Sequence, residues 1–184
     1  CGVPLMISSG LKWEGNGVIS MAMSPSNRMV FYESGNIDGL FRGIGELVGM
    51  PVEHIVIESR RRETKRYIEK LYMANMKEEV DLARNGMREK DLPQDSAIRQ
   101  KLLQVARVIT DNINNVARIN GCGDISLTGG WDTGEEFPWR TMIIRDPYSV
   151  MLYAGDMLGS VEAVEDIDHW IEYREIEEDV YELT

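Results

Sequence analysis

The basic run in "ESRRRETKR", residues 58–66, carries the side chains with the most chemical potential, because guanidinium groups recognise carboxylates and phosphates. On a helical wheel, residues 51–73 form one broad apolar stripe with Arg60 near its centre and Glu63 near its edge. We expect Arg61 and the other basic residues of the run to point elsewhere and to be solvated, offset by nearby acids. An inward arginine needs an acceptor, since an unpaired buried charge is very costly. Arg60 either pairs with Glu63 or a distant carboxylate, or it anchors a carboxylate or phenolate on a ligand.

The other reactive residues form no recognisable catalytic or metal-binding set. His54 and His169 lack metal-ligand spacing with each other or with a cysteine, and no Ser/His/Asp or Cys/His set can be assembled. The pieces "GLFRGIGELVG" and "GCGDISLTGG" lack the spacing of a dinucleotide fingerprint or a P-loop. We therefore expect no catalytic residue, no metal and no cofactor, and we expect Cys122 to be a core thiol.

Acidic side chains crowd one strand and loop, where a cation could sit. They are Asp124, Asp132, Glu135 and Glu136. The ligand pattern of an EF-hand loop is absent, so a solvated acidic loop is the expected structure. A metal-dependent enzyme built on this loop is the most remote of the alternatives.

Methionine and aromatic side chains give the better indication of binding. Methionine accounts for 11 of 184 residues, and its flexible, polarizable side chain adapts to apolar guests as well as filling gaps in a core. Aromatic residues from several segments would meet in a compact fold, as a small-molecule site with one polar anchor requires and as an ordinary core also does. The candidate ligand-binding residues are Arg60 as anchor and Tyr67, Ile109, Trp131 and Met142 as apolar walls.

The length and charge indicate one acidic globular domain, residues 1–184. With 31 acidic and 20 basic residues the net charge is -11, so the overall field repels a phosphate backbone and we expect no nucleic-acid partner. No apolar run approaches the roughly 18 residues of a membrane span. Two cysteines favour a reducing cytoplasm, although the leading Cys1 could be lipidated or belong to a segment of a longer chain.

Turn signals and alternation predict strands in three places. "GVISMAMSPSNRMVFYE", residues 17–33, indicates a hairpin around the turn "SPSN". "DISLTGGW" and "WRTMIIRD" indicate two strands joined by a polar loop, and "HWIEYREI" with "DVYELT" indicates a closing hairpin with "EED" as its turn.

Helical spacing of apolar residues predicts helices over residues 37–48, 51–73, 95–119 and 147–166. Asn36 is the expected N-cap of the first helix, Gly49 its stop, and Pro51 the first residue of the second. Gly39 and Gly43 share a face where another backbone could approach, or they are simply tolerated. A charged stretch up to Gln94 separates the second and third helices. The order β-β-α-α-α-β-β-α-β-β indicates an α+β domain whose antiparallel sheet is covered by helices.

Three consecutive segments, "RMVFYES", "IDGLFRGIGELVG" and "ESRRRETKRYIE", resemble the first half of the 4-vinyl-reductase domain. This hydrocarbon-binding sensor family is related to the TRAPP subunit fold, and the resemblance covers about a third of the chain. Some members bind zinc in a cysteine-rich "GDPYCEF"-like ending. Here "RDPYSVMLYAGDMLG" has no cysteine, and none follows Cys122, so the zinc site is not carried over.

The resemblance implies a non-enzymatic sensor or carrier domain that binds a small apolar or aromatic molecule between helices and sheet. Such domains are often the input of a regulator, and tetrapyrrole-related roles are also attached to the family. The alternative is a homodimerising interaction or scaffold module of TRAPP-like fold without a small ligand. Under either hypothesis we expect a homodimer.

Overall fold

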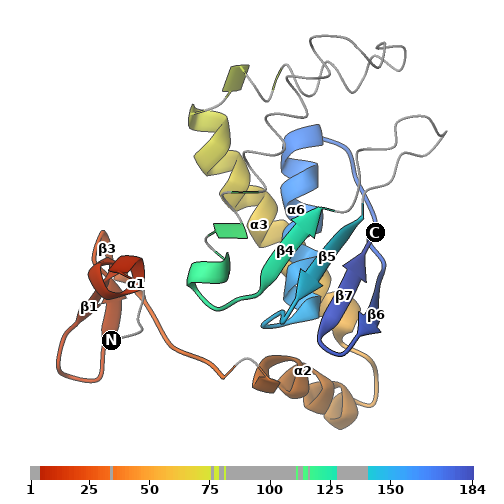
Figure 1. The fold of residues 1–184 in the computed structure, drawn as a ribbon, viewed down its shortest axis with the longest axis horizontal. Helices are drawn as coiled ribbons and strands as arrows, with labels where there is room; N and C mark the ends of the chain where they lie inside the picture. Colours follow the sequence, from red (N-terminus) through yellow and green to blue (C-terminus); the bar gives the residue numbers. More distant parts are fainter. Residues whose placement is uncertain are drawn as a thin grey trace.

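The computed structural model describes residues 5–33, 35–75, 117–127 and 141–184, together with residues 77, 78, 81, 111, 114 and 115. Its helices and antiparallel sheets make an α+β fold, as predicted, and the elements follow the predicted order with one additional helix and strand at the start. The elements are α1 (Leu5–Gly10), β1 (Leu11–Trp13), β2 (Ile19–Met21), β3 (Ser24–Arg28), α2 (Gly35–Val48), α3 (Glu53–Asn75), β4 (Asp124–Leu127), β5 (Met142–Arg145), α6 (Val150–Glu165), β6 (Tyr173–Glu177) and β7 (Val180–Leu183). Figure 1 shows a small N-terminal unit set apart from a body that contains α3, α6 and the second sheet.

The body is built on a four-stranded sheet in the order β4-β5-β7-β6, and all neighbouring strands are antiparallel. Ile144 on β5 pairs with Ile125 on β4 and with Tyr181 on β7. β-branched and aromatic residues fit the pleated, half-buried surface of such a sheet. The predicted closing hairpin is confirmed, and its turn contains Asp179 in the left-handed region (φ 55).

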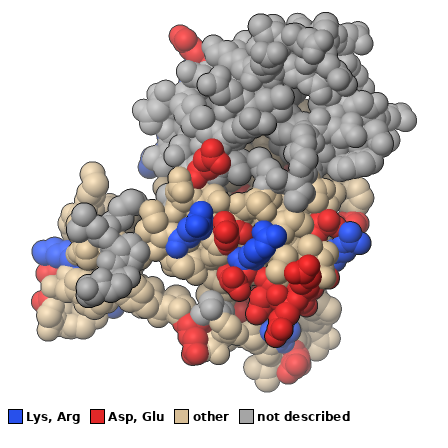
Figure 2. Space-filling model, viewed as in Figure 1, with Lys and Arg blue, Asp and Glu red and all other residues tan. Residues whose placement is uncertain are grey.

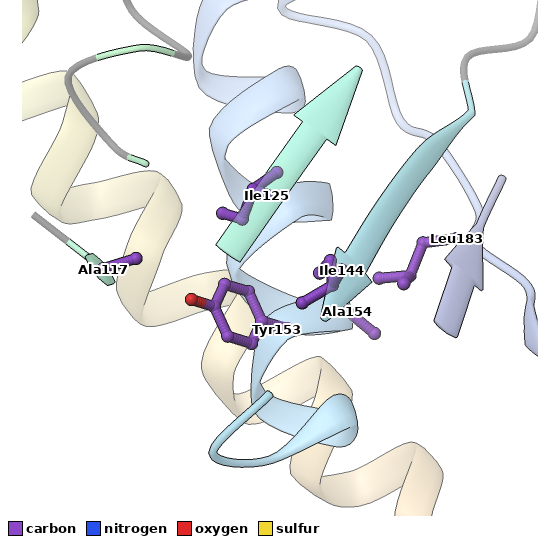
Figure 3. Packing of buried hydrophobic residues seen from close by; sticks show 6 residues of the cluster. All are labelled: Ala117, Ile125, Ile144, Tyr153, Ala154 and Leu183. Atoms are coloured by element: carbon purple, nitrogen blue, oxygen red, sulfur yellow. The ribbon is translucent and has the colours of Figure 1, made fainter. Parts of the chain in front are cut away.

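Helix α6 supplies the side chains that close the core over this sheet. Tyr153 and Ala154 pack with Ile125, Ile144 and Leu183, as Figure 3 shows. Ile144, Ala154 and Leu183 are completely buried, at 0% exposure. The core therefore lies mainly between α6 and strands β4, β5 and β7, and Ala117 also contributes to it.

Polar contacts fix the beginning of α6 and tie it to α2. The N-cap residue Ser149 is extended, and its hydroxyl accepts a hydrogen bond from Leu152 N–H at 3.2 Å. Asp38 on α2 accepts hydrogen bonds from the Ser149 hydroxyl and, at 3.1 Å, from Val150 N–H. A carboxylate at this position also suits the positive end of the helix dipole. The first turn of α6 is thus bonded to α2, 111 residues earlier in the chain.

The α3 and α6 backbones lie against each other at two glycines. A Cβ on Gly155 would lie 2.7 Å from the carbonyl oxygen of Ile57 and 2.6 Å from Cβ of Arg60. A Cβ on Gly159 would collide with the carbonyl oxygen of Arg61. Glycine is needed at both positions because only a residue without Cβ permits this approach. The closeness of the two helices brings polar side chains of α3 within reach of α6.

The N-terminal unit differs in detail from the predicted hairpin. β2 pairs with β3 as expected, but Ser24 is already paired with Met21 and a bulge precedes that pair. The predicted turn "SPSN" therefore lies within β3, where Pro25 is tolerated because β3 is an edge strand. The prediction that the strand continues through residues 29–33 is wrong, because β2 is too short to pair with it and only Met29 N–H still reaches β2.

The ends of α2 follow the prediction at one terminus only. Gly49 ends the helix in the left-handed region (φ 75), and its N–H donates to Gly45 O at 2.9 Å. Asn36 is not the N-cap, since the helix already includes Gly35, and its side-chain amide donates instead to Glu33 at 2.9 Å. At Gly39 no described backbone makes the close approach that was one of the two interpretations, because no described atom lies within 4 Å of a Cβ placed there.

Much of the predicted third helix lies outside the described residues. Residues 117–119 are helical and Gly121 (φ 68) follows them, as the predicted glycine stop requires.

The predicted second helix is α3, which begins two residues after Pro51 and ends at Asn75. Most of the charged stretch to Gln94 and the loop of residues 132–138 also lie outside the described residues. No helix that the structure describes is long and apolar enough to cross a membrane.

Candidate functional site

Arg60 on α3 reaches across to α6, where Asp156 holds it with two hydrogen bonds. Arg60 Nε donates to Oδ1 at 2.7 Å and Nη2 donates to Oδ2 at 3.2 Å, and Thr64 Oγ1 donates to the same Oδ1 at 2.5 Å. Glu63 lies 3.5 Å from Arg60 Nη1 on the exposed side. Burial lowers the pKa of Arg60, but the charge of Asp156 outweighs this and holds the pKa above its ordinary value. The inward arginine therefore has its acceptor within the chain, as the ion-pair interpretation expected.

Arg61 also turns toward α6, which corrects the prediction that it is solvated. Its Nε donates at 2.8 Å to Glu162, which is 0% exposed, and its Nη1 donates at 2.7 Å to Glu58. These two bonds raise the pKa of Arg61. Arg61 lies one turn after Ile57 and three residues before the buried Thr64, so it shares the face of α3 that packs on α6. The helical wheel, which used only the apolar residues of this segment, had left Arg61 outside the face that packs on α6.

Tyr148 and Cys122 lie next to the Arg60–Asp156 pair. The carbonyl oxygen of Cys122 accepts a hydrogen bond from Tyr148 N–H at 2.8 Å. Burial first, and then the negative charge of Asp156, raise the pKa of both side chains. Both groups are therefore protonated and neutral near pH 7, and the Cys122 thiol lacks the thiolate character that a nucleophile needs.

Tyr153 carries a buried hydroxyl that has no hydrogen-bond partner among the described residues. The residue is 4% exposed, and its ring meets that of Tyr148 edge-on at 5.3 Å. Figure 3 shows the hydroxyl directed toward Ala117 and away from Ile144. Burial is the first cause that raises the pKa of Tyr153, followed by Cys122 and Tyr148. A buried unpaired hydroxyl costs about 1–3 kcal/mol, so each such group asks for an explanation.

The five predicted site residues have different outcomes. Arg60 is inward and paired. Met142 is partly buried and packs against the core cluster that contains Tyr153. Tyr67 is 60% exposed, so its prediction as an interior wall is wrong: Thr64 and Ile68 occupy the inner face of α3 instead. Ile109 and Trp131 lie outside the described residues.

Two important residues were not among the predicted site residues. Tyr153 lies in the segment 147–166 that helical spacing predicted as a helix, and a tyrosine among its apolar residues was the available signal, because a buried hydroxyl needs a partner. Glu162 gave no signal, since an acidic residue in a helix is ordinarily exposed. Among the described residues, no three His, Cys, Asp or Glu side chains come together as a metal site, and most of the predicted acidic loop lies beyond them.

Comparisons with known proteins give a structural likeness but no sequence match. No protein-family model matches the sequence, so the predicted membership of the 4-vinyl-reductase family is not confirmed, and no curated protein matches it either. The phenol-responsive sensory domain of the transcription activator PoxR, solved with phenol, is similar in structure with a TM-score of 0.46 and 13% identity. The alignment covers 96% of this chain and 84% of that one. A TM-score of this size does not establish a shared fold, so the function below is derived from the residues of this chain.

Proposed function

We propose that this chain is a non-enzymatic sensor or carrier domain that binds a small, neutral, mostly aromatic or apolar molecule beside Tyr153. The buried hydroxyl of Tyr153, without a partner among the described residues, is the observation that supports the proposal. A ligand with one hydrogen-bonding group would satisfy that hydroxyl while its apolar part packs on the surrounding core. Sites of this kind combine a mostly apolar lining with a few placed polar groups.

The charges around Tyr153 favour a neutral ligand over an anion. Arg60 was a candidate anchor for a carboxylate or phenolate, but Asp156 already takes two of its donors. An anionic ligand beside this pair would meet the negative charge of Asp156, and no described residue offers a free cation there to offset it. Tyr148 and Tyr153 have raised pKa values and stay neutral, so they offer hydroxyl groups for hydrogen bonding and no charge.

The position of Tyr148 couples a ligand bound beside Tyr153 to helix α2. It directly precedes Ser149, the N-cap of α6, which donates to Asp38 on α2. A ligand against Tyr148 and Tyr153 would therefore press on the start of α6, which is hydrogen-bonded to Asp38 on α2. This coupling supports a sensor, in which occupancy changes the position or stability of α2, over a simple carrier.

A thermal-shift screen with a tyrosine variant tests the proposal. The panel contains phenol and indole as neutral aromatics, benzoate as their anionic counterpart, and fatty acids and tetrapyrroles as other apolar classes. A ligand present at 100 times its Kd stabilises by about 2.7 kcal/mol, which corresponds to a Tm rise of roughly 5–10 °C for a chain of this size. We expect such a rise with a neutral aromatic compound and none with benzoate.

The variant Tyr153→Phe removes only the unpaired hydroxyl. Without ligand it should leave the free energy of unfolding unchanged or raise it by up to about 1 kcal/mol, because no hydrogen bond is lost. With ligand it should weaken binding at least about tenfold. Tyr67→Phe, at an exposed ring, is the matched control and should change neither quantity. If no compound class shifts Tm, the scaffold alternative replaces this proposal.

A further inference from the structure

Cys122 lies in a turn next to the unpaired hydroxyl of Tyr153. The N–H of Cys122 donates to the carbonyl oxygen of Ala117 at 2.8 Å, and Figure 3 shows the Tyr153 hydroxyl directed toward Ala117. Ala117 and Tyr153 are members of one buried cluster, and Cys122 packs against it. After burial, Cys122 is the next cause that raises the pKa of Tyr153, because a charge acts most strongly at short range. The buried hydroxyl without a partner is therefore aimed at the space beside this cysteine.

The backbone of Cys122 is fixed on both sides. Its carbonyl oxygen accepts the hydrogen bond from Tyr148 N–H at 2.8 Å. The next residue, Gly123, has φ 134, and a Cβ placed there would lie 3.0 Å from the carbonyl oxygen of Arg145 and 3.2 Å from Cα of Pro147. The turn around Cys122 is therefore in direct contact with the turn between β5 and α6. A side chain on such a rigid support keeps its place, as the wall of a binding site must.

Exposure increases from the Tyr153 hydroxyl toward Cys122. Tyr153 is 4% exposed and Ala117 is 8% exposed. Cys122 is partly exposed, and its neighbours Asn120 and Gly121 are exposed. Cys122 therefore lies on the side of the hydroxyl that is nearer to solvent.

Of the described side chains beside Tyr153, Tyr148 is also partly exposed, but its position is set by the fold. Its ring meets the Tyr153 ring edge-on at 5.3 Å, and the charge of Asp156 is close enough to raise its pKa. The thiol of Cys122 makes a long contact instead, 3.9 Å from Sγ to the carbonyl oxygen of Asn120. The width of the space beside Tyr153 therefore depends on the size of the residue at position 122.

We propose that Cys122 forms the solvent-side wall of the ligand site and is the residue that limits the size of the ligand. This inference rests on the function proposed above, to which it adds the side of entry and the basis of selectivity. Burial raises the pKa of the Cys122 thiol, which is therefore neutral. A neutral thiol packs as a small apolar group and leaves the polar group of a ligand to Tyr153. A smaller residue here would admit a bulkier aromatic molecule, and a larger residue would exclude even phenol.

Chemical labelling of the native thiol tests this wall directly. Cys1→Ser leaves Cys122 as the one cysteine of the chain. Figure 2 shows many acidic side chains on the body and the net charge is -11, so the reagent is the neutral iodoacetamide, which escapes the repulsion that an anionic reagent would meet. Phenol or indole should slow the labelling of Cys122 by the factor 1 + [L]/Kd, which is about tenfold at about nine times Kd.

Labelling during global unfolding would also be slowed by a ligand, because the ligand stabilises the folded state. Low concentrations of urea separate the two routes. Labelling in the folded state should proceed at a rate that does not depend on urea, whereas labelling through unfolding accelerates steeply with it. We expect a rate that is independent of urea below the unfolding transition.

Two substitutions at position 122 test the dependence on size. Cys122→Ala removes Sγ and should improve the affinity for 2-naphthol relative to phenol at least about tenfold, because one heavy atom in an apolar pocket is worth about 10–200-fold. Cys122→Leu adds bulk and should weaken phenol binding at least about tenfold. Tyr67→Phe, at a ring that is 60% exposed, is the control and should leave both affinities unchanged. Circular dichroism checks folding, and labelling of the native thiol decides the question if Cys122→Leu does not fold.

The outcomes separate this inference from the proposed function. If phenol or indole raises Tm in a manner that requires the Tyr153 hydroxyl, but neither compound slows the labelling of Cys122, the wall lies elsewhere and only this inference is overturned. Protection of Cys122 with affinities that do not follow the size of residue 122 also overturns it. If no compound of the panel raises Tm, the proposed function and this inference are overturned together.

Discussion

The substitution Gly155→Ala sets two effects of opposite sign against each other. In the interior of a free helix, alanine is more favourable than glycine by about 1 kcal/mol. Here the new Cβ would lie 2.7 Å from the carbonyl oxygen of Ile57 and 2.6 Å from Cβ of Arg60, and both of these atoms belong to the α3 framework. Relief of these contacts requires the helices to separate by roughly 1 Å, the shortfall from a normal separation of about 3.5–4.0 Å.

That separation has two costs. Overpacking typically destabilises by about 1–3 kcal/mol, and the Arg60–Asp156 bonds, made directly across this contact, lose part of about 1.5–3 kcal/mol. After the gain in helix propensity of about 1 kcal/mol, we expect a net loss of about 1–4 kcal/mol in the free energy of unfolding.

Urea unfolding followed by circular dichroism measures this difference directly. The control is Gly39→Ala on α2, where a Cβ meets no described atom within 4 Å. There only the propensity acts, and we expect a gain of about 0.5–1 kcal/mol. Equal stabilisation by Gly155→Ala and Gly39→Ala would refute the close approach of α3 to α6.

Two further outcomes test the polar groups around Asp156. Asp156→Ala should lower the free energy of unfolding by about 2 kcal/mol, because it leaves the half-buried Arg60 without its main acceptor. The control Glu63→Ala, at a side chain that is 75% exposed, should change it by less than about 0.5 kcal/mol. Equal effects of the two substitutions in urea unfolding would contradict this assignment. The raised pKa values of Tyr148 and Tyr153 predict stability that is complete below about pH 10 and lost above it, because only the unfolded chain ionises there. The last part of the rise in absorbance at 295 nm, from the buried rings, should then coincide with the loss of circular dichroism. Ionisation of all seven tyrosines before unfolding would contradict the burial.

Local signals in the sequence were sufficient for several elements. The left-handed Gly49 ends α2, and the alternating strands after Trp170 form the hairpin β6–β7 around Asp179. These features depend on a few neighbouring residues, and the sequence displays them directly. The misplaced turn at Ser24 shows the limit of the same reasoning, because a bulge in the partner strand shifted the register and drew the turn residues into β3.

The partners of the α3 arginines depend on the tertiary fold. Asp156 follows Arg60 by 96 positions and Glu162 follows Arg61 by 101, and only the close approach of the two helices selects these carboxylates from the 31 acids of the chain. The wheel identified Arg60 as inward, since that follows from helical periodicity alone. It misplaced Arg61 and Tyr67, because the exact face of a helix is set by what packs on it.

The most direct test of the proposed ligand site observes the Tyr153 hydroxyl itself. Tyrosine labelled with ¹³C at Cζ gives one NMR signal per ring, and the signal that is missing from Tyr153→Phe identifies Tyr153. If a neutral ligand bonds this hydroxyl, the Tyr153 signal should shift saturably on titration with phenol or indole and should not respond to benzoate. A Tyr153 signal that no neutral aromatic compound moves, or that benzoate moves equally, would contradict the proposed function.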